Sequence, residues 1–147
     1  MMTSLEYQHK VISTPEHVQG ESIANILSAI ADDKSLVLFN TIAIAGGDSD
    51  ILITRLDVTR KQYYSRISAL MKTGLISRKD RQYMLTSLGK IVYDAQLMIG
   101  RATNTYWKLK AIDSLETEHK LPADERNKII NTLIDNQDII KILVNRC

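Results

Sequence analysis

The sequence lacks most of the residues from which metal sites and disulfide frameworks are built. Its 147 residues include a single cysteine, Cys147, so neither a disulfide framework nor a thiolate cluster around a metal is expected. The three histidines, at positions 9, 17 and 119, are far apart and are best interpreted as solvated side chains. The sequence therefore predicts no metal site and no cofactor.

Long apolar runs are missing too. No stretch approaches the roughly 20 apolar residues that span a bilayer. The opening residues, MMTSLEYQHK, lack the basic segment and apolar core of a secretory signal. With 44% hydrophobic and 24% charged residues, the composition is that of a globular protein about one domain long. We expect the chain to stay in the cytoplasm, with no membrane partner.

Residues suited to catalysis are equally scarce. The carboxylates are scattered, and no Ser/His/Asp or Cys/His set shares a plausible site. Gly46 and Gly47 stand side by side, but no phosphate-loop lysine follows them. The sequence thus predicts a protein that is not an enzyme.

Positive charge gathers in one part of the chain. The net charge is only +2, from 19 Lys and Arg against 17 Asp and Glu. From Ser49 to Lys90, nine Lys or Arg stand against three Asp, a balance of +6, which leaves −4 elsewhere (10 against 14). Such a cluster is the electrostatic footprint of nucleic-acid binding, although a charged patch also marks many ordinary solvated faces.

The stretch from 59 to 73, TRKQYYSRISALMKT, lies within this basic segment and is typical of a helix. Thr59 and Gln62 have the spacing of a capping box, and Val58 and Tyr63 that of a hydrophobic staple. The opposite face carries guanidinium, ammonium, phenol and hydroxyl groups, which suit a major groove, so we interpret the stretch as a recognition helix. Its apolar stripe, at steps of four and three, is expected to consist of Tyr63, Ile67 and Leu70.

Three helices are expected before this stretch. They cover residues 22–31, residues 34–45 up to Gly46-Gly47, and a short helix capped by Asp48 or Ser49 that runs through Arg55. Residues 1–20 show no sustained period and are expected to form a flexible tail. The expected inward residues are Ile23, Ile26, Leu27 and Ile30 in the first helix and Ile51, Leu52 and Leu56 in the third.

A longer segment, LITRLDVTRKQYYSRISALMKTGLI, resembles the one that bacterial and archaeal winged helix-turn-helix regulators write roughly as L-A-x-x-L-G-[LV]-S-x-x-x-[VL]-S-R-x-L-x-x-L-x-x-x-G-L-[IV]. The resemblance is to the MarR/PadR/ArsR-like group, of archaeal type, and covers about residues 23–93. Asp57 departs from it, since the family usually has Gly in the turn, and Ile53 stands where a small residue is common. The matching residues are Leu56, Val58, Thr59, Tyr63, Ser65, Ile67, Leu70, Gly74, Leu75 and Ile76.

The residues after Gly74 are typical of a β-hairpin. We expect strands at Leu75–Arg78 and Arg81–Leu85, folded about Lys79-Asp80. The resemblance implies that this hairpin is the wing, which in the family approaches the minor groove or flanking phosphates. Taken alone, its basic tip is better interpreted as that of a solvated hairpin, and the neighbouring recognition helix is what favours contact with DNA.

The first two turns of the recognition helix are expected to contact bases, because Arg and Lys can pair with O6 and N7 of guanine. Which residue reads a base stays open. The candidates for base contacts are Arg60, Lys61, Tyr64 and Ser65. The candidates for contacts to the DNA backbone, which set register without reading sequence, are Arg66, Ser68, Lys72, Arg78, Lys79 and Arg81.

Residues 87–147 are expected to form a helical, coiled-coil-like extension whose first helix is capped by Thr86. That helix would reach roughly 40 Å if it ran unbroken from Ser87 to near Leu115, and a final helix would start at Pro122. We favour homodimerisation through these helices over an intramolecular hairpin. The candidate interface residues are Leu88, Val92, Ala95, Ile99, Ala102, Tyr106 and Leu109.

The sequence thus predicts a mainly α protein with a small β-wing that regulates transcription as a homodimer. Its expected parts are the tail at 1–20, the winged helix-turn-helix at 21–86 and the dimerisation extension at 87–147. We expect it to bind specific sequences in double-stranded DNA, with helix 59–73 in the major groove and wing 75–85 on flanking backbone or minor groove. The alternative is a winged-helix module that binds another protein of the transcription apparatus.

Overall fold

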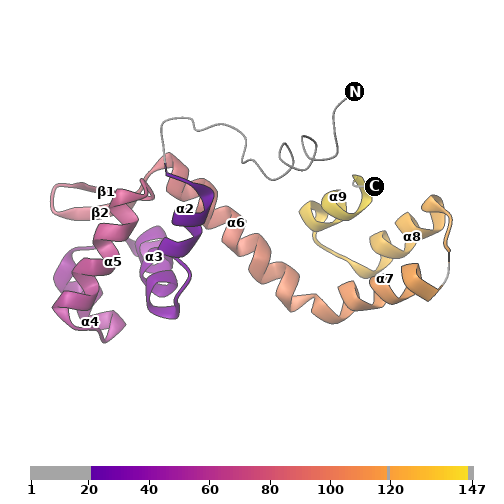
Figure 1. The fold of residues 1–147 in the computed structure, drawn as a ribbon, viewed down its shortest axis with the longest axis horizontal. Coiled ribbons are helices and arrows are strands. Elements are labelled where there is room, and N and C mark those ends of the chain that lie inside the picture. The colour runs from indigo at the N-terminus through magenta and orange to yellow at the C-terminus, as the bar shows by residue number, and fades with distance from the viewer. Residues whose placement is uncertain (1–20, 119, 146–147) are drawn as a thin grey trace, which may run out of the picture. The chain divides into compact units, whose positions relative to one another are not determined.

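A computed structural model describes residues 21–118 and 120–145 of the chain. The expected tail at 1–20, all the histidines and Cys147 lie outside these residues. The fold is mainly helical with a small antiparallel sheet (Figure 1). The elements are α2 (Ile23–Ala29), α3 (Asp33–Ala45), α4 (Ser49–Leu56), α5 (Arg60–Lys72), β1 (Ile76–Lys79), β2 (Gln82–Leu85), α6 (Ser87–Asn104), α7 (Tyr106–Glu118), α8 (Ala123–Leu133) and α9 (Gln137–Asn145).

The chain divides into two compact units, Met1–Tyr93 and Asp94–Cys147. This division falls inside α6, a few residues beyond the domain boundary that the sequence suggests, because Val92 and Tyr93 pack against the core of the first unit. None of the helices among the described residues combines the length and the apolar character needed to cross a membrane.

Polar side chains fix where the helices of the first unit begin. Ser22, Asp32, Asp48 and Thr59 each stand one residue before a helix. Each side chain accepts a hydrogen bond from the backbone N–H three residues on, at 2.9 to 3.1 Å. Such caps satisfy N–H groups that have no partner within the helix. The predicted helix positions are confirmed, and Asp48 rather than Ser49 caps α4.

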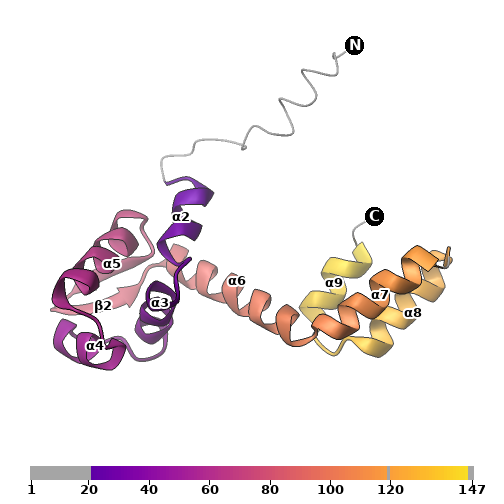
Figure 2. The same cartoon turned by 60° about the horizontal axis from the view of Figure 1, so that its bottom comes forward.

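The core of the first unit is formed mainly by α3, α4 and α5. Helix α3 contacts α4 and β2, while α5 contacts α2 and β1 (Figure 1 and Figure 2). The predicted stripe of α5 is confirmed, since Tyr63, Ile67 and Leu70 are all buried. The fully buried side chains of this core include Leu38, Phe39, Leu52, Tyr63, Leu70 and Leu75.

Three residues predicted to face inward are exposed. The inward face of α2 is centred on Ile26, Ala29 and Ile30, which leaves Ile23 and Leu27 at its edge, 63% and 52% exposed. In α4 the inward side is set by Leu52 and Leu56, one turn apart, so Ile51 is rotated away and is 48% exposed. Periodicity located these helices correctly but misjudged the centre of the buried face.

Strands β1 and β2 pair with Ile76 opposite Leu85 and Lys79 opposite Gln82. The turn is therefore Asp80-Arg81, one residue later than predicted, and both have positive φ, 53° and 66°. This is the conformation of a tight type I′ hairpin turn, whose twist matches that of the strands. The sheet is extended on its other side by Gly47, whose carbonyl accepts a hydrogen bond from the Tyr83 N–H at 3.3 Å.

Helix α6 starts close against the hairpin. The Thr86 hydroxyl donates to the Gly74 carbonyl at 2.5 Å and accepts from the Gly89 N–H at 3.0 Å, which confirms the predicted cap. A Cβ on Gly89 would stand only 2.0 Å from the Leu75 carbonyl oxygen. Glycine at this position allows the first turn of α6 to pack on the backbone that leads into β1.

The predicted unbroken helix from Ser87 to near Leu115 is wrong, because α6 ends at Asn104 and α7 begins at Tyr106. Between them, the hydroxyl of Thr105 donates to the carbonyls of Arg101 and Ala102. Threonine and asparagine are weak helix formers, and their side chains compete for backbone hydrogen bonds. Three such residues in succession, at 103–105, mark the break.

The predicted single final helix is also wrong, because α8 ends at Leu133 and α9 begins at Gln137. The Asn136 side chain accepts hydrogen bonds from the N–H groups of Asp138 and Ile139, at 3.0 and 3.1 Å. Asn136 is thus a helix cap inside a segment in which steps of three and four continue, with Gln137 between the apolar Leu133 and Ile140. The start of α9 therefore could not be recognised from residue spacing alone.

The second unit has a core of its own, formed by Ile112, Ile130, Ile134, Ile139 and Ile140. Arg126 of α8 joins its helices, since its Nε pairs with the Glu116 carboxylate of α7 and its Nη1 donates to the Leu143 carbonyl of α9 at 3.0 Å. Of the seven candidate interface residues, Ala102 and Leu109 pack against this core and Val92 against that of the first unit. The exposed ones are Leu88, Ala95, Ile99 and Tyr106.

The end of α4 provides a test of the backbone geometry. Asp57 lies in the left-handed region, at φ 51° and ψ 53°. We expect Asp57→Ala to be less stable than Asp57→Gly by about 1 kcal/mol, because a Cβ in this region is crowded by the following carbonyl oxygen. Urea unfolding of the two variants measures the difference.

The matched control is Thr54, an exposed residue within α4. There the order should reverse, with the Gly variant about 1 kcal/mol less stable than the Ala variant, because glycine disfavours a helix interior. Equal stabilities of the two Asp57 variants would contradict the left-handed end of α4.

Candidate nucleic-acid interface

Helix α5 is buried on one side and exposed to solvent on the other. Tyr63 is fully buried, and its hydroxyl lies 3.2 Å from the Ser49 hydroxyl of α4. Burial raises the pKa of the Tyr63 phenol, so this group stays neutral and holds the two helices together by a neutral hydrogen bond. The outward side of α5 exposes Arg60, Lys61, Tyr64, Ser65, Ser68 and Lys72.

The start of α5 is fixed by the predicted capping box, which is confirmed. The Gln62 N–H donates to the Thr59 hydroxyl at 3.1 Å, and the Gln62 side-chain oxygen accepts from the Thr59 N–H at 3.2 Å. Val58 packs against the core immediately before this cap. The direction in which Arg60 and Lys61 leave the backbone is therefore set by a satisfied local structure.

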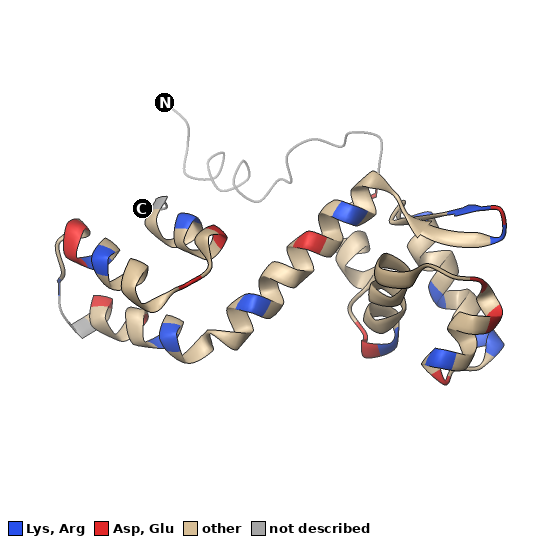
Figure 3. Cartoon of the chain, turned by 180° about the vertical axis from the view of Figure 1, so that it is seen from behind, with Lys and Arg blue, Asp and Glu red and all other residues tan. Residues whose placement is uncertain are grey.

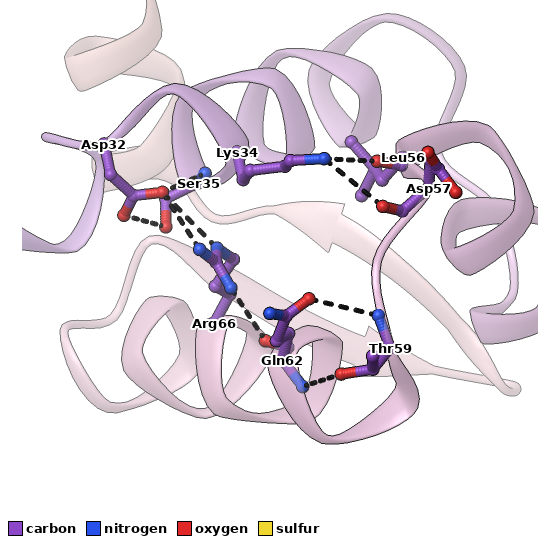
Figure 4. A network of polar contacts seen from close by, with 8 residues as sticks. All are labelled: Asp32, Lys34, Ser35, Leu56, Asp57, Thr59, Gln62 and Arg66. Carbon is purple, nitrogen blue, oxygen red and sulfur yellow. Dashed lines mark hydrogen bonds and ion pairs between the residues drawn. The ribbon is translucent and has the colours of Figure 1, made fainter.

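A polar network ties α5 and the end of α4 to the start of α3 (Figure 4). The Asp32 carboxylate accepts from the Ser35 N–H at 2.9 Å and from the Ser35 hydroxyl at 2.6 Å, and pairs with Arg66 of α5 at 3.3 Å. The Lys34 ammonium donates to the carbonyls of Leu56 and Asp57, at 3.3 and 3.2 Å. A cation at these carbonyls compensates the negative end of α4.

This network gives Arg66 a partner that the sequence did not suggest. Its guanidinium also donates to the Gln62 carbonyl, and its side chain is only 25% exposed. Among the candidates for backbone contacts, Arg66 is thus the one that forms an ion pair with another of the described residues. We assign it to the positioning of α5 rather than to its outward surface.

Cationic side chains continue from α5 onto the hairpin. Arg78, Lys79 and Arg81 are exposed, with Asp80 between the last two. In Figure 3 the hairpin carries blue Lys and Arg positions around a red acidic one. The Arg78 guanidinium lies over the ring of the buried Tyr83, 5.7 Å from its centre, which orients it by a cation–π contact. A shallow groove between α5 and the hairpin is bordered by Lys72 and Arg78.

Arg60 forms an ion pair with an acidic residue, but the pair is weak. Its guanidinium is 3.4 Å from the Asp50 carboxylate of α4, and the two side chains are 70% and 82% exposed. Ion pairs this exposed contribute little, because water competes for both charges. Arg60 therefore stays available to another anion.

Sequence reasoning identified the outward residues of α5 and the cations of the hairpin, but missed Asp32, Lys34 and Gly47. Asp32 carried a local signal, since an aspartate before an apolar periodic segment is a frequent helix cap. Its pairing with Arg66, 34 positions away, could not be predicted from the spacing of residues in the sequence. The same holds for the Gly47 bridge to Tyr83.

No protein-family model, curated protein or solved structure matches this chain. Within the described residues, no three His, Cys, Asp or Glu side chains are grouped so that they could hold a metal ion. The assignment of a function therefore depends on the surface of α5 and the hairpin.

The Asp32 network predicts a pH dependence of stability. Hydrogen bonds from Ser35 and then the charge of Arg66 hold the pKa of Asp32 below its ordinary value of 3.8. A lowered pKa in the folded state adds stability above the unfolded pKa, and this stability is lost as the pH falls through the folded value. We expect Asp32→Asn, which keeps a helix-capping side chain, to destabilise the protein at pH 7 by less than about 1 kcal/mol, because the ion pair is half exposed.

Urea unfolding at pH 7 and near pH 3 tests this, and the difference between wild type and Asp32→Asn should shrink at the lower pH. Asp33→Asn, at an exposed neighbouring carboxylate, serves as the control. A difference for Asp32→Asn that is unchanged between the two pH values would contradict the role of the carboxylate.

Proposed function

We propose that the first unit binds double-stranded DNA as a winged helix-turn-helix module, with α5 as the recognition helix and the β1–β2 hairpin as the wing. The observation that carries the proposal is the two-sided character of α5. Its inner side is fixed by Tyr63, Ile67 and Leu70, while its outer side exposes cationic and hydroxyl groups next to a cationic hairpin. A helix held in this way can enter a major groove without unfolding its own core.

The connection between α4 and α5 supports the helix-turn-helix assignment. It consists of Asp57 in the left-handed conformation, Val58 packed on the core and Thr59 as the helix cap. Asp57 takes the position where similar regulators usually have glycine, and aspartate tolerates this conformation better than most residues. The departure of the sequence from the family pattern is thus compatible with the same turn.

In this proposal the cations divide into two roles. Arg60 and Lys61, in the first turn of α5, contact base edges, where a bidentate pair with guanine is worth about 1–3 kcal/mol of discrimination. Lys72, Arg78, Lys79 and Arg81 contact phosphates, which contribute affinity that falls with salt. Arg66 makes neither contact, since it is paired with Asp32.

We further propose that the protein regulates transcription as a homodimer. Leu88, Ile91, Ala95 and Ile99 are exposed and lie on one side of α6, at steps of three and four. Burying such a side against a second copy would remove apolar surface from water. Two-fold symmetry would then present two recognition helices to half-sites one helical turn, or a multiple of it, apart.

A winged-helix module that binds another protein is the rival, and one observation favours it. Trp107 of α7 is 76% exposed and lies beside Tyr106, whose ring centre is 5.3 Å away. Exposed aromatic residues are frequent anchors of protein interfaces. Salt separates the two proposals, because binding through several phosphate contacts weakens steeply with salt and an apolar contact does not.

The experiment that tests the proposed function is selection of bound sequences from a random duplex pool at moderate salt. Sequence-specific binding by a dimer predicts an enriched, roughly palindromic motif. No enrichment, with binding of duplex DNA absent at low salt as well, would contradict the proposal.

Changing both Arg60 and Lys61 to Ala should abolish preference among DNA sequences while leaving the fold intact, because both side chains are exposed. The measurement is the ratio of affinities for a selected and a scrambled duplex, which should fall by about tenfold or more, the value of one good bidentate contact. The charge-matched control is Lys108→Ala with Lys128→Ala, two exposed lysines of the second unit. An unchanged ratio in the Arg60 and Lys61 variant would remove the recognition-helix assignment.

Ile99→Asp should dissociate the dimer, because it places an unpaired charge in the proposed interface. Ile99 is 65% exposed in the single chain, so the monomer should stay folded. Sedimentation gives the oligomeric state and circular dichroism the fold. Asn104→Asp, an exposed residue on the opposite side of α6, adds the same charge and should remain dimeric. A dimeric Ile99→Asp variant would mean that this side of α6 is not the interface.

A further inference from the structure

Tyr64 differs from the other outward residues of α5 because its side chain is large, apolar and held in place. It is 48% exposed, yet its ring packs edge-on against that of Tyr63, with ring centres 5.1 Å apart and planes at 75°. Tyr63 is itself fully buried and hydrogen-bonded to Ser49. Tyr64 is therefore a half-exposed ring braced by a rigid one.

The surroundings of Tyr64 change character along α5. One turn before it lie the cationic Arg60 and Lys61, while one and two turns after it Ser68 and Met71 are exposed without charge. Met71 is 43% exposed. The shallow groove beside the hairpin is lined by Tyr64, Ile67, Ser68, Met71, Lys72, Arg78 and Tyr83. The outward side of α5 thus carries an uncharged strip, with the exposed side chains of Tyr64, Ser68 and Met71, between cations.

We propose that Tyr64 determines sequence specificity by packing its ring against the C5-methyl group of a thymine. This inference rests on the proposed function. In the major groove the thymine methyl is the apolar feature of the base edges, and aromatic and aliphatic side chains contact it. The other base-contact candidates, Arg60, Lys61 and Ser65, have polar ends that suit hydrogen-bonding base atoms.

The bracing by Tyr63 favours this role over that of a solvated tyrosine. A side chain that is already fixed loses little conformational entropy on binding. More of the free energy of its contact therefore contributes to affinity. The ring is the part of Tyr64 that packs on Tyr63. The proposed contact therefore requires the ring and a methyl group, and does not require the phenol oxygen.

The test removes the methyl group from the DNA and the hydroxyl group from the protein separately. In a duplex carrying the selected site, each dT is replaced in turn by dU, which pairs identically but lacks the C5-methyl. Each half-site should contain one position at which a single dU replacement weakens binding of the wild type about fourfold, the ratio expected for the loss of one buried methyl group. Tyr64→Phe should show the same sensitivity at the same position, and Tyr64→Ala should show none there.

Thermal unfolding of both variants provides the control for the fold, since Tyr64 lies outside the core and neither change should lower the midpoint by more than a few degrees. Wild-type affinity that is insensitive to every dU replacement would overturn the inference and leave the proposed function standing. Loss of affinity in Tyr64→Phe would also overturn it, because the hydroxyl would then be the contacting group. Failure of the selection to enrich any motif would overturn the inference, and absence of duplex binding at low salt as well would overturn the proposed function too.

Discussion

Helix α5, besides its buried stripe, is restrained at the start of α3 by the carboxylate of Asp32. This carboxylate caps α3 through Ser35 and pairs with Arg66 in the middle of α5, while Lys34, two residues on, holds the carbonyl end of α4 (Figure 4). A few residues at the start of α3 therefore restrain both helices of the proposed DNA-binding motif. Each contact is weak because it is partly exposed, but together they limit rotation of α5 about its buried stripe.

With this restraint, one short helix could combine a structural role with the proposed role in DNA binding. The buried side of α5 is apolar apart from the Tyr63 hydroxyl, which Ser49 satisfies. Among the described residues, no buried side-chain polar atom lacks a hydrogen-bond partner, so the polar side chains in the core of the first unit are satisfied. Substitution of exposed side chains such as Lys61 and Ser68 should therefore leave the fold intact.

Local patterns predicted the first unit well and the second one poorly. The capping box at Thr59, the stripe from Tyr63 to Leu70 and the cap at Thr86 were readable because each depends on residues three or four apart. The breaks at Thr105 and Asn136 were missed because steps of three and four continue through both, at the second with Gln137 in an otherwise apolar series. Side-chain hydrogen bonds nevertheless interrupt the helix at both places. The pairing of Asp32 with Arg66 depends on the folded chain and could not be read from spacing.

Titration with a duplex that carries the selected site, followed by amide NMR spectra, tests most directly whether α5 and the hairpin form one DNA-binding surface. We predict that the first resonances to shift belong to the outward residues of Arg60–Lys72 and to residues 76–85. The resonances of the core around Ile112 and Ile130 should not shift. Shifts confined to residues 94–145, or none at saturating DNA, would contradict this prediction.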